Sequence, residues 1–95
     1  MRRAARIDAN QGEIVDAARG VGATVWITSA LGNGGPDLVI GRRGTNFCVE
    51  VKDGSKSPSK RVLTPDEAAF CRDWQGQYSV IENVEQLYML LGVRP

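Results

Sequence analysis

The sequence predicts an α/β fold in which a mixed β-sheet is flanked by helices. Three features of the chain lead to this prediction: an apolar stripe with helical spacing near the N-terminus, two β-rich runs that flank a glycine-containing turn, and a helix-capping sequence downstream of them. In chain order, the predicted elements are a helix, three strands, a helix, a strand and a helix. We expect a single domain over residues 1–95, because a chain of this length leaves too little sequence for a second core.

The first predicted helix covers residues 7–19, and glycines at positions 20 and 22 end it. Its apolar side chains recur with the spacing of one helical face, which is formed by Ile7, Ile14, Ala18 and Val21. Glu13 falls at the border of this apolar stripe, whereas Asp16 points away from it. Glu13 is therefore the helix carboxylate that could lean toward a functional site.

Three β-rich runs follow the helix. Residues 23–28 alternate in the manner of a strand, and a glycine-rich loop at residues 31–36 separates this strand from the next. Residues 37–40 and 47–52 lie on either side of a turn-forming stretch at 41–46, so they are predicted to form an antiparallel hairpin.

The hairpin has a register that follows from symmetric closure about its turn. Leu38 then faces Val49 and Ile40 faces Phe47, with Val51 continuing the same apolar surface. On the other surface, this register places Asp37 opposite Glu50, and Lys52 lies on the same side because it follows Glu50 by two positions.

The remaining elements complete the sheet and its cover. A flexible loop is predicted at residues 53–61, followed by a helix at 64–74 with Thr64 as N-cap and Glu67 completing a capping box. A short strand at residues 78–81 and a mostly apolar helix at 84–91 end the chain.

The chain contains no histidine, and this absence excludes several classes of enzyme. Ser-His-Asp and Cys-His nucleophilic sites, histidine-rich zinc sites and nucleases with a histidine base all require that residue. Cys48 and Cys71 have no CxxC spacing and are expected to be reduced thiols. Any hydrolysis must then depend on Mg²⁺ or Mn²⁺ held by carboxylate oxygens. We expect no small-molecule cofactor.

Composition also gives expectations about location and assembly. No apolar run approaches the ~20 residues that a membrane crossing requires, and no signal segment follows the N-terminal arginines. We expect no membrane partner and a cytoplasmic, bacterial or phage-like protein. A domain this small buries a modest fraction of its surface, so we expect a homodimer.

Basic residues are clustered although the net charge is only +1. If a metal ion cancels the acidic residues, these clusters could form a positive rim that binds the phosphates of DNA. Ordinary solvated surface charges are an equally good explanation for any one cluster. The clusters are Arg2, Arg3 and Arg6, then Arg42 and Arg43, then Lys56, Lys60 and Arg61.

Asp37, Glu50 and Lys52 form the strongest candidate site. Cross-strand partners lie about 5 Å apart at Cβ, and two carboxylates at that distance repel unless one is protonated or a cation lies between them. Lys52 could orient or deprotonate the attacking water, or neutralise charge that develops on a phosphate. An isolated Glu-x-Lys is more often a surface ion pair, so the candidate site depends on Asp37 as well.

The motif resembles the PD-(D/E)xK nuclease superfamily, with Pro36-Asp37 followed thirteen positions later by Glu50-Val51-Lys52. The compact size and the helix start at Thr64 look most like stand-alone VRR-NUC domains. The resemblance implies a restriction-endonuclease-like αβββαβ core and a Mg²⁺- or Mn²⁺-dependent endodeoxyribonuclease. It implies that Asp37, Glu50 and the Val51 carbonyl bind the metal, and that Glu13 is the helix carboxylate. Many relatives carry glutamine where this chain has Glu67.

Three functions follow from these observations. The preferred one is phosphodiester hydrolysis in branched DNA, such as a Holliday junction, which the two sites of a dimer would cut symmetrically. A nucleic-acid-binding module with an idle nuclease fold is the first alternative. A restriction or mismatch endonuclease is the second, although 95 residues leave little room for a base-reading element.

Overall fold

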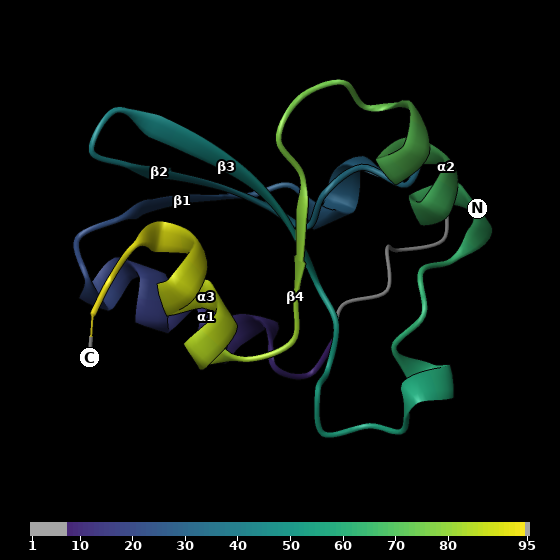
Figure 1. The fold of residues 1–95 in the computed structure, drawn as a ribbon, viewed down its shortest axis with the longest axis horizontal. Coiled ribbons are helices and arrows are strands. Elements are labelled where there is room, and N and C mark those ends of the chain that lie inside the picture. Colours follow the sequence, from purple (N-terminus) through teal and green to yellow (C-terminus); the bar gives the residue numbers. More distant parts are fainter. Residues whose placement is uncertain (1–7, 95) are drawn as a thin grey trace.

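The computed structural model describes residues 8–94 and confirms the predicted order of elements. Strands β1 to β4 form a four-stranded mixed sheet in that spatial order (Figure 1). The helices are α1 (Gln11–Gly20), α2 (Pro65–Asp73) and α3 (Val84–Leu91), the strands are β1 (Thr24–Ile27), β2 (Leu38–Arg42), β3 (Thr45–Val51) and β4 (Ser79–Ile81), and two short 3₁₀ turns are η1 (Ser29–Leu31) and η2 (Pro58–Lys60).

The sheet has the register that the hydrophobic pattern predicts. In the antiparallel pair of β2 and β3, Leu38 lies opposite Val49 and Ile40 lies opposite Phe47. The turn is tighter than expected, because Arg43 (φ 51°) and Gly44 (φ 79°) both adopt left-handed conformations and the strands run up to them. Strand β1 pairs antiparallel with β2, whereas β4 pairs parallel with β3.

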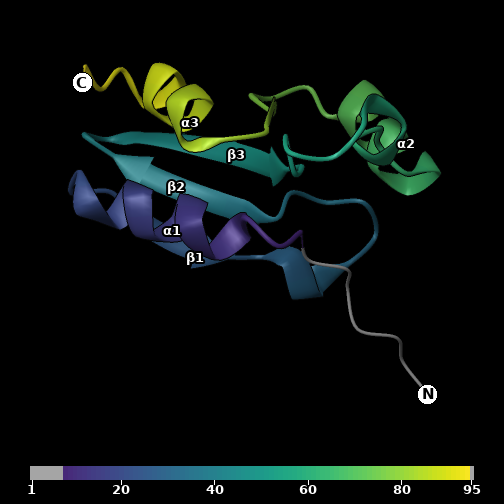
Figure 2. The same ribbon diagram turned by 90° about the horizontal axis from the view of Figure 1, so that it is seen from below.

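The hydrophobic core lies on one face of this sheet. Helices α1 and α3 contact each other and cover that face (Figure 2). Alternate residues of the strands point toward the two helices, and full burial of each such side chain stabilises the fold by roughly 1.5–3 kcal/mol. The most completely buried apolar side chains are Ile14, Leu38, Ile40, Val49, Val51 and Leu87.

Helix α2 lies away from this pair, beyond the end of β3 (Figures 1 and 2). Its first turn packs against the glycine-rich loop: a Cβ added at Gly34, which has φ 75°, would collide with the backbone carbonyl of Asp66. The Thr64 hydroxyl and the Glu67 carboxylate form the predicted capping box at the start of α2. The loop and α2 therefore enclose the edge of the sheet where β2 begins and β3 ends. Among residues 8–94, no helix is both long and apolar enough to cross a membrane.

Candidate active site

Asp37 is held in place by its backbone and by its carboxylate. It precedes β2 by one residue, and its carbonyl oxygen accepts a hydrogen bond from the Thr28 amide at 2.8 Å. Its Oδ2 accepts a second hydrogen bond from the Val51 amide at 2.9 Å. Because Leu38 lies opposite Val49, continuing the register by one residue brings Asp37 beside Glu50, as the sequence predicts. The carboxylate is fixed against β3 and 8% exposed.

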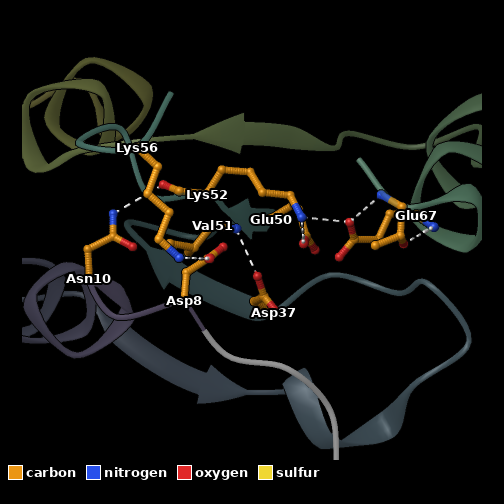
Figure 3. A network of polar contacts seen from close by, with 9 residues as sticks. Asp8, Asn10, Asp37, Glu50, Val51, Lys52, Lys56 and Glu67 are labelled. Carbon is orange, nitrogen blue, oxygen red and sulfur yellow. Dashed lines mark hydrogen bonds and ion pairs between the residues drawn. The ribbon is translucent and has the colours of Figure 1, made fainter. Parts of the chain in front are cut away.

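Lys52 lies between two carboxylates at the end of β3 (Figure 3). Its Nζ is 3.7 Å from Glu50 Oε2 and 2.7 Å from Glu67 Oε1. The Lys52 backbone is fixed as well, because its amide donates to the Ile81 carbonyl at 2.9 Å and its carbonyl accepts from Asn10 Nδ2 at 3.1 Å. The lysine ammonium is thus positioned by three elements of the fold.

Glu67 has a role in the site that the sequence analysis missed. Its Oε1 accepts from the Thr64 amide at 2.9 Å and also from Lys52 Nζ at 2.7 Å. One carboxylate oxygen therefore caps α2 and holds the lysine. The capping box explained Glu67 from sequence alone. Its position shortly after the Glu-x-Lys strand, where many relatives of the resembled family carry glutamine, was the signal for the second contact.

These side chains line a cavity of about 400 Å³. The loop that connects β3 to α2 forms one wall of it, and Asp8 lies opposite, with its Oδ1 3.9 Å from Lys56 Nζ (Figure 3). The wall thus carries lysines next to the carboxylates of the floor, an arrangement that suits an anionic ligand. The lining residues are Asp8, Asp37, Glu50, Lys52, Lys56, Ser59, Lys60, Val62, Thr64 and Glu67.

The pKa values of the three carboxyl groups at the site, Glu50, Asp37 and Glu67, are shifted in different directions. Burial, the hydrogen bond to Glu67 and the charge of Asp37 raise the pKa of Glu50 from 4.5 to about 10. Burial also raises the pKa of Asp37, and the hydrogen bond from Val51 opposes that change. Burial acts in the same direction on Glu67, but hydrogen bonds from Glu50 and Lys52 outweigh it and lower the pKa of Glu67 to about 2. In the absence of a cation, Glu50 is therefore a neutral acid that donates to ionised Glu67.

Lys52 remains charged at neutral pH. Burial disfavours its ammonium form, yet Glu67 and then Glu50 favour that form and raise the pKa of Lys52 above 10.5. This direction suits a group that stabilises negative charge more than one that removes a proton from water.

The donor set fits one hard cation. Glu50 Oε1 is buried and has no hydrogen-bond partner among the described residues, and Asp37 supplies a second carboxylate beside it. Mg²⁺ is commonly bound by one or two carboxylates and several waters, so two are sufficient. In residues 8–94, no three carboxylate or cysteine side chains form a ready-made metal cage.

Glu13 does not line this cavity. It is exposed on α1 and borders a separate hollow with Asp53 and Glu82. The reason is the helical phase: Gln11 faces the protein interior at 5% exposure, and a residue two positions later is rotated by about 200° around the helix. The structure therefore does not bring the predicted helix carboxylate to the site. Asp8, just before α1, approaches it instead.

The predicted basic rim is only partly assembled. Lys56 and Lys60 line the cavity, but Arg61 forms an ion pair with Glu82 at 3.2 Å. Arg42 donates to the Leu91 carbonyl at 2.9 Å, at the far end of the hairpin, and Arg43 occupies the hairpin turn. Arg42 and Arg43 therefore do not line the cavity, and their contact with DNA stays a prediction. Arg2, Arg3 and Arg6 lie outside the described residues.

Comparison with known proteins supports the fold. No protein-family model matches this sequence, and neither does any curated protein. A solved structure described as a VRR_NUC domain is 25% identical, with a TM-score of 0.58, and the alignment covers 90% of this chain and 97% of that one. The resemblance predicted from sequence is thereby confirmed: the chain has the fold of a VRR-NUC nuclease-like domain. The roles of the individual site residues stay predictions.

Proposed function

We propose that this VRR-NUC nuclease-like domain is a Mg²⁺- or Mn²⁺-dependent DNA endonuclease with Asp37, Glu50 and Lys52 in its active site. The single observation that carries the proposal is the convergence of two buried carboxylates and a charged lysine at the end of a strand pair, in one cavity with two further lysines. Metal-dependent phosphodiester hydrolysis uses carboxylates that bind the metal, a cation near the phosphate and access for a polyanion.

Asp37 and Glu50 would hold the metal, with the Val51 carbonyl as a third ligand. When bound, the metal supplies Lewis acidity and lowers the pKa of water. Glu50 would hold the metal in its ionised form, since only that form is a ligand. Its buried Oε1 has no hydrogen-bond partner among the described residues and would be available for this. Asp37 keeps its hydrogen bond from the Val51 amide, which orients the remaining oxygen.

Lys52 stabilises the charge that develops on the phosphate. Its pKa is raised and its Nζ is held by Glu67 at 2.7 Å, so it stays an ammonium group at neutral pH. Removing one such donor from a transition-state site costs about 100- to 1000-fold in rate. Lys56 and Lys60, on the cavity wall, would bind flanking phosphates of the DNA.

The finer substrate proposal is branched DNA. One cavity of this kind cuts one strand, so a two-fold homodimer would introduce paired nicks into a four-way junction. This proposal depends on the analogy with structure-selective nucleases. The idle nucleic-acid-binding module is a distinguishable outcome of the same assay.

The test is cleavage of labelled four-way junction, flap and plain duplex DNA with Mg²⁺, Mn²⁺ or EDTA. The proposal predicts metal-dependent paired nicks in the junction and a loss of about 100-fold or more in Lys52→Ala. Glu13→Gln is the matched control, because Glu13 lies outside the cavity. Binding without cutting under any metal would favour the idle module, and equal cutting of all three substrates would refute the preference for branched DNA.

A further inference from the structure

Acidic and basic residues are segregated along this chain. Residues 17–36, 38–49 and 86–95 contain no aspartate or glutamate, yet they carry Arg19, Arg42, Arg43 and Arg94. The acidic residues all lie in the remaining segments, which include the candidate active site. A separation of this kind favours a positive potential where the acid-free segments meet. The nearest carboxylate in sequence is Asp16, which is exposed on α1 three positions before Arg19.

The fold brings these three segments together at one end of the molecule. The end of α1 meets the start of β1 through the Ala23 amide and the Ala18 carbonyl at 3.1 Å. Thr24 of β1 pairs with Gly41, next to the hairpin turn. Arg42 then joins the hairpin to the end of α3 through the Leu91 carbonyl at 2.9 Å. Figure 1 shows this end opposite α2.

We call Arg19, Arg42, Arg43 and Arg94 the arginine end. Arg42 serves the fold, since it satisfies a carbonyl at the C-terminus of α3. The other three are exposed, and within residues 8–94 none of them forms an ion pair. In contrast, Arg61 and Arg72 are each paired with a carboxylate.

Arg43 occupies a position that does not suit an arginine. It is the first residue of a two-residue hairpin turn and has φ 51°. Asparagine, aspartate and glycine are favoured there, because other side chains are strained in the left-handed region. Turn geometry therefore does not explain this residue, and an outlier of this kind points to a functional contact.

The distance between the arginine end and the cavity sets the length of duplex that could contact both. Glu50 follows Arg43 by seven positions, which at about 3.3 Å per residue is roughly 23 Å along the strand. Base pairs of DNA are about 3.4 Å apart, so this distance corresponds to roughly seven base pairs. A duplex that lies along β3 would reach both places only if it is longer than that.

We propose that the arginine end is a second binding surface for the phosphate backbone of duplex DNA, engaged when the duplex extends about seven base pairs or more from the cavity. The inference rests on the proposed function in one respect, namely that DNA is the substrate. It adds a surface that lies outside the cavity and has no part in hydrolysis.

The experiment measures DNA affinity by fluorescence anisotropy in EDTA, with hairpin duplexes of about 6 and about 16 base pairs. The variant combines Arg19→Gln, Arg43→Asn and Arg94→Gln, and Arg72→Gln is the charge-matched control. For the long duplex, affinity falls with salt, and the slope of log affinity against log salt becomes shallower by about 0.9 for each lost phosphate contact. In the triple variant the change is up to about 2.7. Its affinity for the short duplex stays at the wild-type value.

Arg43→Asn alone provides a variant that keeps the fold, because asparagine accepts the left-handed conformation of this turn. We expect a slope change of about 0.9 on the long duplex only. Wild-type affinity and slope in both variants would overturn the inference and leave the proposed function intact. Failure of the wild-type protein to bind either duplex would overturn the DNA proposal and the inference with it.

Discussion

Replacing Glu50 by glutamine tests whether this buried carboxyl carries a proton when no cation is bound. The residue is 1% exposed, and burial, together with Glu67 and Asp37, raises its pKa from 4.5 to about 10. A carboxyl whose folded-state pKa is raised contributes stability that is complete below its unfolded pKa. That contribution is lost as pH rises from about 4.5 toward about 10.

The magnitude follows from the pH interval. At pH 7, Glu50 is ionised in the unfolded chain and neutral in the folded chain. This difference lowers the free energy of unfolding by up to about 3 kcal/mol, at roughly 1.4 kcal/mol per pH unit. Glutamine has the same shape, does not ionise, and can still donate a hydrogen bond to Glu67. We therefore expect Glu50→Gln to be more stable than wild type at pH 7 by about 1–3 kcal/mol.

The assay is urea unfolding in EDTA at pH 5, 7 and 8.5, with Glu13→Gln as the control for loss of a surface carboxylate. The stability difference between Glu50→Gln and wild type should increase with pH, whereas that of the control should not. A difference that stays constant with pH, or a variant that is less stable than wild type at pH 8.5, would show that Glu50 is not protonated in the folded chain. The same variant should lose the stabilisation that Mg²⁺ gives the wild type.

Two further predictions concern the elements around the site. Glu67→Ala should lower the free energy of unfolding by about 1–2 kcal/mol, because it removes the acceptor for the Thr64 amide at the start of α2 and the partner of Lys52. Glu67→Gln keeps an oxygen that can accept from the Thr64 amide and from Lys52. Its free energy of unfolding should therefore fall by less than half of that amount. Thermal denaturation measures both variants, and equal losses would contradict the shared role of that oxygen. Gly34→Ala should be destabilised by about 2–4 kcal/mol, since its Cβ collides with Asp66 and its φ is positive. Gly22 also has a positive φ, 84°, but a Cβ added there would meet no atom within 4 Å. Gly22→Ala therefore measures the cost of the backbone conformation without a collision, and a similar loss of stability in both variants would argue against the collision at Gly34.

The hairpin could be predicted closely because several patterns in it agree. The alternation of Leu38 and Ile40 on one strand, and of Val49 and Val51 on the other, allows one register with a buried face. A shift by one residue would expose all four side chains. The same register places Asp37 beside Glu50, so the position of these two carboxylates could be predicted from sequence.

Other parts of the site depend on tertiary placement that local patterns do not contain. Glu13 was predicted to lean toward the site, but the phase of α1 turns it outward. Glu67 was explained by capping, and only the packing of α2 beyond the end of β3 brings it to Lys52. Arg42 and Arg43 were predicted to contribute to a positive rim, and the fold places them at the hairpin turn, away from the cavity that Lys56 and Lys60 line.

The most direct test of the account is the single-turnover cleavage rate of four-way-junction DNA as a function of Mn²⁺ concentration, for wild type, Asp37→Asn and Glu13→Gln. Asp37→Asn keeps an oxygen that can accept from the Val51 amide but loses the charge that binds the cation. The account predicts saturating cleavage by wild type and Glu13→Gln, and at least about 100-fold slower cleavage by Asp37→Asn at every Mn²⁺ concentration. Cleavage by Asp37→Asn at the wild-type rate, or a loss of cleavage in Glu13→Gln but not in Asp37→Asn, would contradict the assignment of the active site.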